Sequence, residues 1–461
     1  MKYTVKAQYL ICTLILLVFS LFFSFSATAE KHANGPAAAS PLDYQIARWF
    51  KFKKAAFSIT FDDNYRFQVT QAMPLLNQYN YKATYFIVTN RVGNGYAPGW
   101  DTLNMLALQG HEIGSHSKNH ADFYYLSQCP QCADSMVREF RDSRDTINAR
   151  IPSQQCETFA WPFGAVNAAS IEVGKQYYMA CRGSINQYEG SDPANFYNIM
   201  SQHVYHDTPL ETVNGYVDTI VYDEGWLVER WHGYRVLHDT NGYEPVPVGE
   251  FGAHLNHVAQ NENSLWIATL GHVVKYIRER DSSVFSLIDS SGYSVTFSLR
   301  NNLPDTLFHY NVPLTVRVKV YGKMADVYMI TQGNDTLPFT ISYLYGAKYL
   351  YVDAIPNHGF IELHLPDPTG IQGVFALHGG AGNFPNPFIS VTNIVFDLRE
   401  AGLADIFVCD LKGRVLRDYS GLYEAGRNSI EFDGSGLPAG VYYCIIRSRE
   451  RKAVVSMVHT K

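Results

Sequence analysis

Three features are missing from this 461-residue sequence, and each absence removes a class of protein. The net charge is −6 and basic residues form no stripe, which argues against nucleic acid as a partner. After the first thirty residues no apolar run is long enough to span a bilayer. No repeat has solenoid spacing. Aromatic residues are plentiful instead, with 32 Tyr and 27 Phe, which indicates a folded chain and is compatible with sugar contact.

Residues 1–29 are typical of a secretory signal peptide. Lys2 and Lys6 precede an apolar block that ends near Phe25, and a small-x-small cleavage site ends at Ala29. An uncleaved membrane anchor is the alternative, because the apolar block is long. Cleavage would leave no transmembrane segment, and the small, polar residues 30–49 would form a linker.

Six cysteines remain after cleavage, and export permits disulfides. Cys129 and Cys132 form a C-x-x-C, which suits a disulfide, a zinc pair or a redox pair. Because no second C-x-x-C is present, a structural zinc site is the weaker interpretation. We expect structural disulfides among Cys129, Cys132, Cys156 and Cys181, with the pairing open. The remaining two cysteines, which could pair with each other, are Cys409 and Cys444.

Strand-like and helix-like segments alternate over residues 50–280. Residues 55–61 predict a buried strand, and apolar spacing predicts a helix that follows it. A later helix would take Asp101 as its N-cap and end before Gly110. Such alternation predicts a parallel sheet or an α/β barrel, in which functional residues gather at the carboxyl ends of the strands.

From residue 281 the pattern changes to short alternating strands separated by Asn, Asp, Gly and Pro. It predicts an all-β sandwich over 281–367, a linker over 368–387 and a last β block over 388–461. The expected fold class is therefore a multidomain chain, with an α/β domain followed by two all-β, Ig-like sandwich domains.

Two adjacent carboxylates, Asp62 and Asp63, end the first buried strand. His116 and His120 follow another strand-like run, and one turn of helix would put both rings on the same face. Two imidazoles and one carboxylate make three metal ligands and leave one position open, as in catalytic sites. The second carboxylate could then act as a base, and the charge of the metal would keep both aspartates ionised.

Hydrolysis also needs an acid for the leaving group. The segment RWHGYRVLHDT offers His232 and His238. His238 follows the apolar YRVL, at an expected strand end, so we prefer it, with Asp239 or another carboxylate to orient it. His232 would then be structural or would line the cleft, although the reverse assignment, with His232 as the acid, remains open.

The segments TFDD, HSKNH, FAWPFG and RVLHD, in this order, resemble the motifs of the NodB-type polysaccharide deacetylases, carbohydrate esterase family four. The resemblance covers about residues 50–280. It implies a distorted (β/α) barrel that removes acetyl groups from N- or O-acetylated sugars with a divalent metal, commonly zinc, with cobalt or manganese as alternatives. It also implies that Asp62 is the base, that Asp63, His116 and His120 bind the metal, and that His238 is the acid.

The same resemblance implies that the metal and a backbone N–H near Phe163 hold the oxyanion, beside Trp161 and the cleft residue His232. The sequence departs from the family in two places. Ala160 stands where the third motif often carries an arginine, and the fourth-motif region has Arg182 in place of the usual Asp and Trp. We hypothesise that Arg182 supplies the missing guanidinium from another strand.

The C-terminal segments FPNPF, VCDLKGRVL and KAVVSMVHTK resemble the sorting domain of type IX secretion substrates. The resemblance implies export through the periplasm of a Gram-negative, Bacteroidetes-type bacterium. The type IX secretion machinery would then carry the protein across the outer membrane, for release or for attachment to the cell surface. A plain Ig-like module is the alternative.

The leading hypothesis is a secreted, metal-dependent deacetylase that attacks an acetylated glycan with a metal-activated water. One alternative is a metal-dependent hydrolase of small amides or cyclic imides. The other is a catalytically silent glycan-binding protein, which the missing arginine at Ala160 favours.

Overall fold

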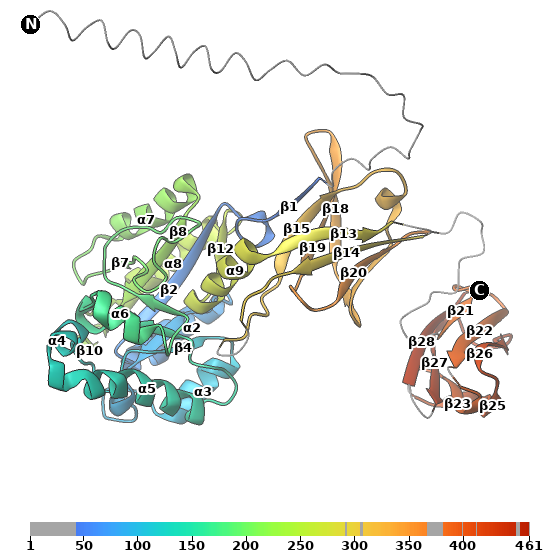
Figure 1. Cartoon of the computed structure of the whole chain (residues 1–461), viewed down its shortest axis with the longest axis horizontal. Helices are drawn as coiled ribbons and strands as arrows, with labels where there is room; N and C mark the ends of the chain where they lie inside the picture. The colour runs from blue at the N-terminus through green and yellow to red at the C-terminus, as the bar shows by residue number, and fades with distance from the viewer. Residues whose placement is uncertain are drawn as a thin grey trace, which may run out of the picture. The chain divides into compact units, whose positions relative to one another are not determined.

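The computed structural model describes residues 43–290, 293–304, 308–366, 381–398, 400–411, 413–448 and 452–460. The expected signal peptide, most of the first linker and most of the second linker lie outside these residues. Within the described ranges, no helix is both long and apolar enough to cross a membrane. The chain contains one region of mixed helices and strands and two regions built from strands (Figure 1).

The first region is a curled parallel half-barrel with the strand order β6–β5–β4–β3–β2–β8–β7 and with β12 also paired to β2. The strands are β2 (Ala55–Asp62), β3 (Thr84–Ile87), β4 (Glu112–Ser115), β5 (Thr158–Ala160), β6 (Ala180–Arg182), β7 (Gln202–His203), β8 (Trp226–Trp231) and β12 (Leu265–Ile267). Arg182, at the end of β6, forms a parallel bridge with Ile199, which lies just before β7. The bridge therefore links the two outer strands of the sheet. Because its pairings are parallel, the carboxyl ends of the strands share one edge.

Helices surround this sheet in Figure 1. They are the π-helical turn Gln68–Ala72, α2 (Met73–Gln78), α3 (Trp100–Leu108), α4 (Phe123–Gln128), α5 (Ala133–Arg150), α6 (Ala168–Gly174), α7 (Leu210–Asp223), α8 (Val248–Gln260) and α9 (Leu270–Ser282). The predicted cap of α3 is wrong, because Gly99 is the N-cap and Asp101 lies in the first turn. Gly110 follows the helix end as predicted, with φ of +88°.

The expected strand YRVLHD is a hairpin that lies outside the main sheet. β9 (Tyr234–Val236) pairs with β10 (Asp239–Asn241) and with β11 (Val246–Pro247) in a separate three-stranded sheet. The strand of the main sheet is β8, which ends at Trp231. His232 therefore follows a strand of the main sheet, whereas His238 lies in the turn of the hairpin.

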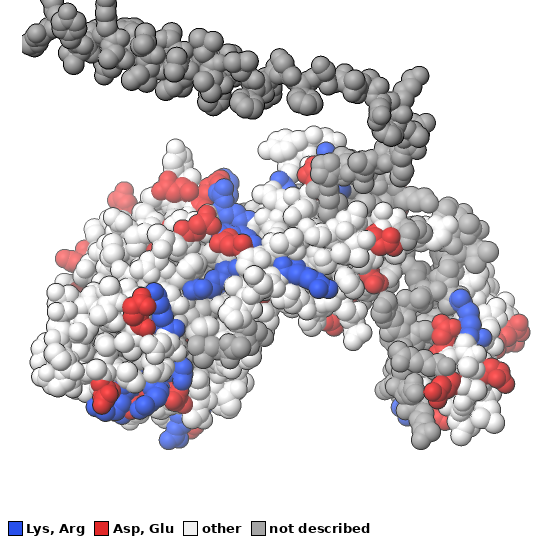
Figure 2. Space-filling model, viewed as in Figure 1, with Lys and Arg blue, Asp and Glu red and all other residues white. Residues whose placement is uncertain are grey.

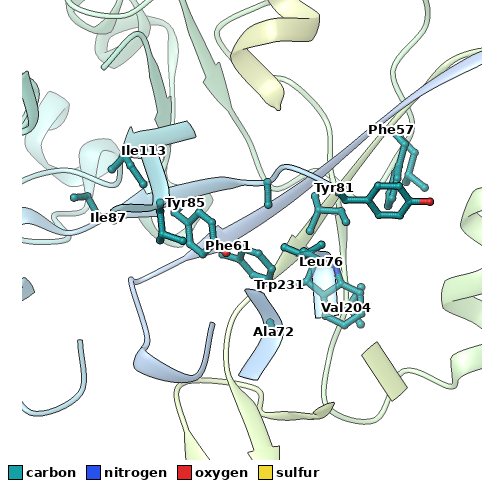
Figure 3. Close-up of a cluster of buried hydrophobic side chains, with 14 of the residues drawn as sticks. Phe57, Phe61, Ala72, Leu76, Tyr81, Tyr85, Ile87, Ile113, Val204 and Trp231 are labelled. Carbon is teal, nitrogen blue, oxygen red and sulfur yellow. The ribbon is translucent and has the colours of Figure 1, made fainter. Parts of the chain in front are cut away.

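An aromatic core holds the strand that carries the two aspartates. β2 is buried along its whole length, as expected for a parallel strand covered on both faces. Figure 3 shows Phe61 of β2 beside Tyr85 and Trp231, and the ring centroids of Phe61 and Tyr85 lie 4.9 Å apart. Burying each such ring stabilises the fold by about 1.5–3 kcal/mol. The end of β2 is thus a rigid support for a site.

The second region has two antiparallel sheets, β1–β15–β19–β18 and β13–β14–β20–β16–β17. The strands are β1 (Tyr44–Ile46), β13 (Val284–Asp289), β14 (Ser294–Arg300), β15 (Leu314–Lys319), β16 (Met329–Gln332), β17 (Asp335–Leu337), β18 (Phe339–Leu344), β19 (Ala347–Ala354) and β20 (Phe360–His364). Residues 44–46, which the sequence assigned to a linker, pair with β15. An Ig-like sandwich stays a prediction.

The third region contains the sheets β21–β22–β26 and β24–β23–β27–β28, with β25 paired to β23. The strands are β21 (Ala381–Phe384), β22 (Val391–Leu398), β23 (Gly402–Cys409), β24 (Val415–Asp418), β25 (Gly421–Tyr423), β26 (Gly426–Asp433), β27 (Gly440–Ser448) and β28 (Lys452–His459). These strands enclose a core of their own around Phe388 and Phe432.

Charged side chains of both signs lie among one another on the face drawn in Figure 2. Several basic residues pair with the acidic residue next to them in the sequence, for example Arg141 with Asp142 and Arg144 with Asp145. Pairs of this kind neutralise charge locally.

The cysteines form one disulfide among the described residues, between Cys129 and Cys132. Cys156 and Cys181 are buried free thiols, so the wider disulfide set expected from the sequence is wrong. Cys409 and Cys444 are also free. The strand register explains this, because Cys444 is opposite Val408 and Cys409 is opposite Tyr443.

Candidate active site

A pocket of about 600 Å³ opens at the carboxyl edge of the half-barrel. Asp62 at the end of β2, and Asp63 directly after it, line this pocket together with His116 and His120, which follow β4. The structure therefore brings together the residues of the first two sequence motifs.

Asp63, His116 and His120 form a cluster whose possible ligand atoms all lie within 4.8 Å of one another. His120 Nε2 is 3.2 Å from Asp63 Oδ1. His116 Nδ1 lies 2.8 Å from the carbonyl oxygen of Ala160, so Nδ1 carries the hydrogen and Nε2 keeps its lone pair for a cation.

A loop, not the expected helical turn, brings His116 and His120 together. Ser117 and His120 have φ of +69° and +62°, which an α-helix does not allow. Ser117 Oγ accepts hydrogen bonds from the backbone N–H groups of His120 and Ala121, at 2.8 and 3.2 Å. The two imidazole centroids end 4.8 Å apart, with the rings nearly perpendicular.

The electrostatics of the cluster suit a divalent cation. Burial lowers the pKa of His116 to about 4, and burial followed by the charge of Arg91 lowers the pKa of His120 to about 4. Both imidazoles are therefore neutral at neutral pH. Burial raises the pKa of Asp63, and Arg91 lies 2.8 Å from its Oδ1. Neutral imidazoles with a carboxylate are the donor set of catalytic zinc sites, so these residues fit a metal.

Asp62 is held by Arg182, which is 1% exposed and ends β6. Arg182 donates to Asp62 Oδ2 at 2.5 Å and to the carbonyl oxygen of Gly183 at 2.7 Å. Burial would raise the pKa of Asp62, but the interactions with Arg182 first, and then with His116, His232 and Arg230, together outweigh it and hold this pKa well below its usual range. The other oxygen, Oδ1, is buried and makes no hydrogen bond to the described residues.

His232 lines the pocket, and its Nε2 lies 3.6 Å from Asp62 Oδ2. His238, the preferred acid in the sequence, is exposed in the hairpin turn and does not line the pocket, and neither does Asp239. The preference for His238 is therefore wrong in placement, because the strand that reaches the site ends at Trp231. His232 lines the cleft, as one of the two roles expected for it, so the geometry favours the reverse assignment that the sequence left open.

Trp161 and Phe163 both contribute to the pocket, in different ways. Phe163 is 71% exposed, has φ of +60°, and places its ring centroid 4.4 Å from that of His120. Trp161 is buried and donates its indole N–H to the carbonyl oxygen of Tyr197 at 2.9 Å. Phe163 is thus available to a ligand, whereas Trp161 mainly supports the wall.

Several residues that line the pocket were not predicted from the sequence. His203 comes from β7, a strand of only two residues, which is too short for a recognisable pattern. Arg230 is buried near the end of β8, where a charge argues against a strand. Arg91 ends the 3-10 turn Thr89–Arg91, and the others approach from loops and are Tyr65, Ser184, Tyr205 and Tyr243.

A parallel half-barrel that carries an Asp–His–His cluster and a separate Asp–His pair has a site whose side chains suit hydrolysis. Residues 51–181 match the family model of polysaccharide deacetylases, and residues 383–459 match that of the secretion system C-terminal sorting domain. The chain therefore carries a domain of the polysaccharide deacetylase family, a class of hydrolases, and a sorting domain, as the sequence resemblance implied.

Among similar proteins, a gellan lyase of a Bacillus species is 28% identical over 346 residues, which are 70% of this chain and 13% of that protein. A chitin deacetylase of Colletotrichum lindemuthianum is 23% identical over 214 residues, which are 42% of this chain and 77% of that protein. The solved structure of the Streptococcus pyogenes deacetylase PplD with acetate is 22% identical. That comparison covers 32% of this chain and 64% of PplD, with a TM-score of 0.27. The chain spans only a small part of the lyase.

Proposed function

We propose that the protein is an exported, metal-dependent deacetylase that releases acetyl groups from a glycan. The observation that carries the proposal is the convergence of two sets of groups in one pocket. One set, the Asp63 cluster, can hold a cation, and the other, Asp62 with His232, can move protons. The match of residues 51–181 to the deacetylase family supports this reading.

Asp63, His116 and His120 would hold the metal, with zinc the first choice for this donor set. A divalent cation there supplies a Lewis acid that polarises the acetyl carbonyl and lowers the pKa of water. Asp62 acts as the base: it is ionised, one oxygen is fixed by Arg182, and Oδ1 is left to take the proton of the attacking water. A backbone N–H beside Phe163 would help to hold the oxyanion.

His232 is the acid in this proposal. Its Nε2 lies on the side of the ring that faces Asp62, so it can deliver a proton to the departing nitrogen or oxygen of the sugar. The exposed rings of Phe163, Tyr205 and Tyr243 at the pocket are suited to pack against a sugar. The sorting domain supports export by the type IX machinery, to the medium or the cell surface.

The test is acetate release by the chain from residue 42 onward, loaded with Zn²⁺, Co²⁺ or Mn²⁺. The panel contains acetylated glucosamine oligomers, chitin, peptidoglycan and acetylated xylan. Gellan is included because one of the similar proteins is a gellan lyase. Small amides and cyclic imides complete the panel. We expect release from at least one glycan, lost in Asp62→Asn and His232→Ala but kept in His238→Ala. Turnover of the small amides alone, or tight glycan binding without acetate release, would overturn the proposal.

A further inference from the structure

The partner of His232 is another histidine. His203 Nε2 lies 3.1 Å from His232 Nδ1, and the ring centroids are 4.7 Å apart. His203 reaches this position because β7 pairs in parallel with β8, which puts His203 opposite Arg230. Both side chains are nearly buried, and Tyr205 packs on His203 with a centroid distance of 3.8 Å.

His203 is held as a neutral ring. Burial, followed by the charge of Arg230, lowers the pKa of His203 to about 2, whereas burial lowers the pKa of His232 only to about 4, so a proton taken up by the pair resides on His232. The charged or titratable groups that face the pair from the surrounding elements are Asp62, His120, Arg182, Arg230, Tyr243 and Glu244. Because two of these are arginines, a second cation at position 203 would be unfavourable.

The hydrogen bond has only one arrangement when His232 is charged. An imidazolium donates from both nitrogens, so His203 Nε2 must accept and the hydrogen of His203 must be on Nδ1. The proton that His232 then releases is the one on Nε2, the nitrogen that faces Asp62. After the transfer, His232 is neutral, the leaving group has gained one proton, and the Nδ1–H of His232 still donates to His203.

We propose that His203 is a positioning residue for the acid His232: it fixes the ring and retains the Nδ1 hydrogen, so that only the Nε2 proton is transferred. This inference rests on the proposed function. It goes further in stating that the acid works without direct support from a carboxylate at Nδ1, and therefore titrates lower than a carboxylate-paired histidine.

The test compares wild type with three variants at position 203, each loaded with metal and assayed for acetate release from pH 4 to 10. In His203→Ala, kcat falls roughly a hundredfold while KM and metal affinity change less than about threefold, because an acid–base contribution is lost. In His203→Asp, a carboxylate stabilises the imidazolium, so the alkaline limb of kcat/KM moves up by about one pH unit or more. In His203→Asn, which offers a neutral acceptor, the limb stays at its wild-type position.

His257→Ala is the matched control, because His257 is a partly exposed histidine that pairs with Asp218 outside the pocket. Superimposable pH profiles for wild type and His203→Asp, or full activity in His203→Ala, would overturn the proposal. Crystal structures provide a readout that needs no activity: the His232 ring should leave Asp62 in His203→Ala and keep its place in His203→Asn. If the His232 ring does not move in His203→Ala, His203 does not position it. If the ring moves as expected but the wild-type protein releases no acetate, only the proposed function is contradicted.

Discussion

Arg182 on β6 and Asp62 on β2 form a buried ion pair at 2.5 Å, although three strands separate β6 from β2 in the sheet order. In a flat sheet, four strand spacings of about 4.8 Å would put them roughly 19 Å apart, beyond the reach of an arginine. The contact exists because the sheet curls, so the fold itself places the guanidinium beside Asp62, the proposed base.

Replacing Arg182 should damage catalysis more than substrate binding. Arg182→Ala removes the strongest of the interactions that offset the burial of Asp62, so the pKa of Asp62 rises. Asp62, the proposed base, must be ionised. On acidification the variant should therefore lose activity at a higher pH than wild type does. We expect kcat to fall on the order of 10²-fold at neutral pH with little change in KM, together with about 3–5 kcal/mol of lost stability. Steady-state kinetics across pH and urea unfolding measure these effects.

Two further variants separate this role from general damage. Arg278→Ala removes a partly buried arginine that stacks on Phe196 outside the pocket, and it should keep wild-type kcat. Ala160 is paired with Arg182 across β5 and β6, so both side chains face the same way. Ala160→Arg in the Arg182→Ala background should therefore recover part of the lost kcat. Wild-type activity in Arg182→Ala would show that Asp62 needs no guanidinium.

The neighbouring aspartates should separate metal binding from catalysis. Asp63→Asn removes the carboxylate of the ligand cluster and should weaken zinc affinity at least 10- to 100-fold, with activity restored only at high metal concentration. Asp62→Asn should keep its zinc and lose turnover. Isothermal titration with Zn²⁺, and metal content after dialysis against a chelator, measure the difference. Equal zinc affinity in the two variants would contradict the assignment.

Acid should destabilise the half-barrel through His111, a buried histidine away from the pocket. His111 Nδ1 accepts the Ala83 N–H at 3.1 Å, and burial, then Lys82, lowers its pKa to about 4. The unfolded chain, with a histidine pKa of about 6.5, binds more protons between pH 4 and 6.5. The free energy of unfolding therefore falls as the pH drops through this window. His111 should account for on the order of 1–2 kcal/mol between pH 7 and 5.

The measurement is urea unfolding followed by tryptophan fluorescence, which reports the half-barrel because all 6 Trp lie between residues 49 and 266. His111→Asn keeps an acceptor for Ala83 and does not titrate, so it should lose less stability than wild type on acidification. Other buried histidines act equally in both proteins and cancel in the comparison. An identical loss in both would exclude His111 as the cause.

The ligand cluster could be predicted from the sequence because its signal is local. Asp62 and Asp63 end an apolar strand, and His116 lies four residues before His120. Within each of these short segments, the sequence alone determines which side chains lie close together. The helical turn expected for the histidines was wrong for a related reason. Residue spacing does not reveal that the Ser117 side chain caps a loop with positive φ.

The proposed acid, His232, could not be predicted because the strand that leads to it contains charges. β8 reads WLVERW, and the partners that make its charges tolerable are distant in sequence: Glu229 lies 3.1 Å from His254, and Arg230 is buried near Asp62. Without those partners the apolar YRVL looks like the better strand, and it leads to His238. Arg182 could be proposed because Ala160 stands where the motif often has an arginine, which prompted the search for another arginine. His203 takes the place of no residue that the motifs lead one to expect.

The thiols give a prediction that does not depend on function. The chain from residue 42 onward has six cysteines, of which Cys129 and Cys132 are bonded and four are buried and free. The four free thiols of the native protein should therefore hardly react with a thiol reagent. After denaturation without a reductant it should show four thiols, and after reduction six. Peptide mapping under non-reducing conditions should recover Cys129 and Cys132 linked within one peptide. A value of two thiols before reduction would mean that another pair, such as Cys409 with Cys444, forms in spite of its register.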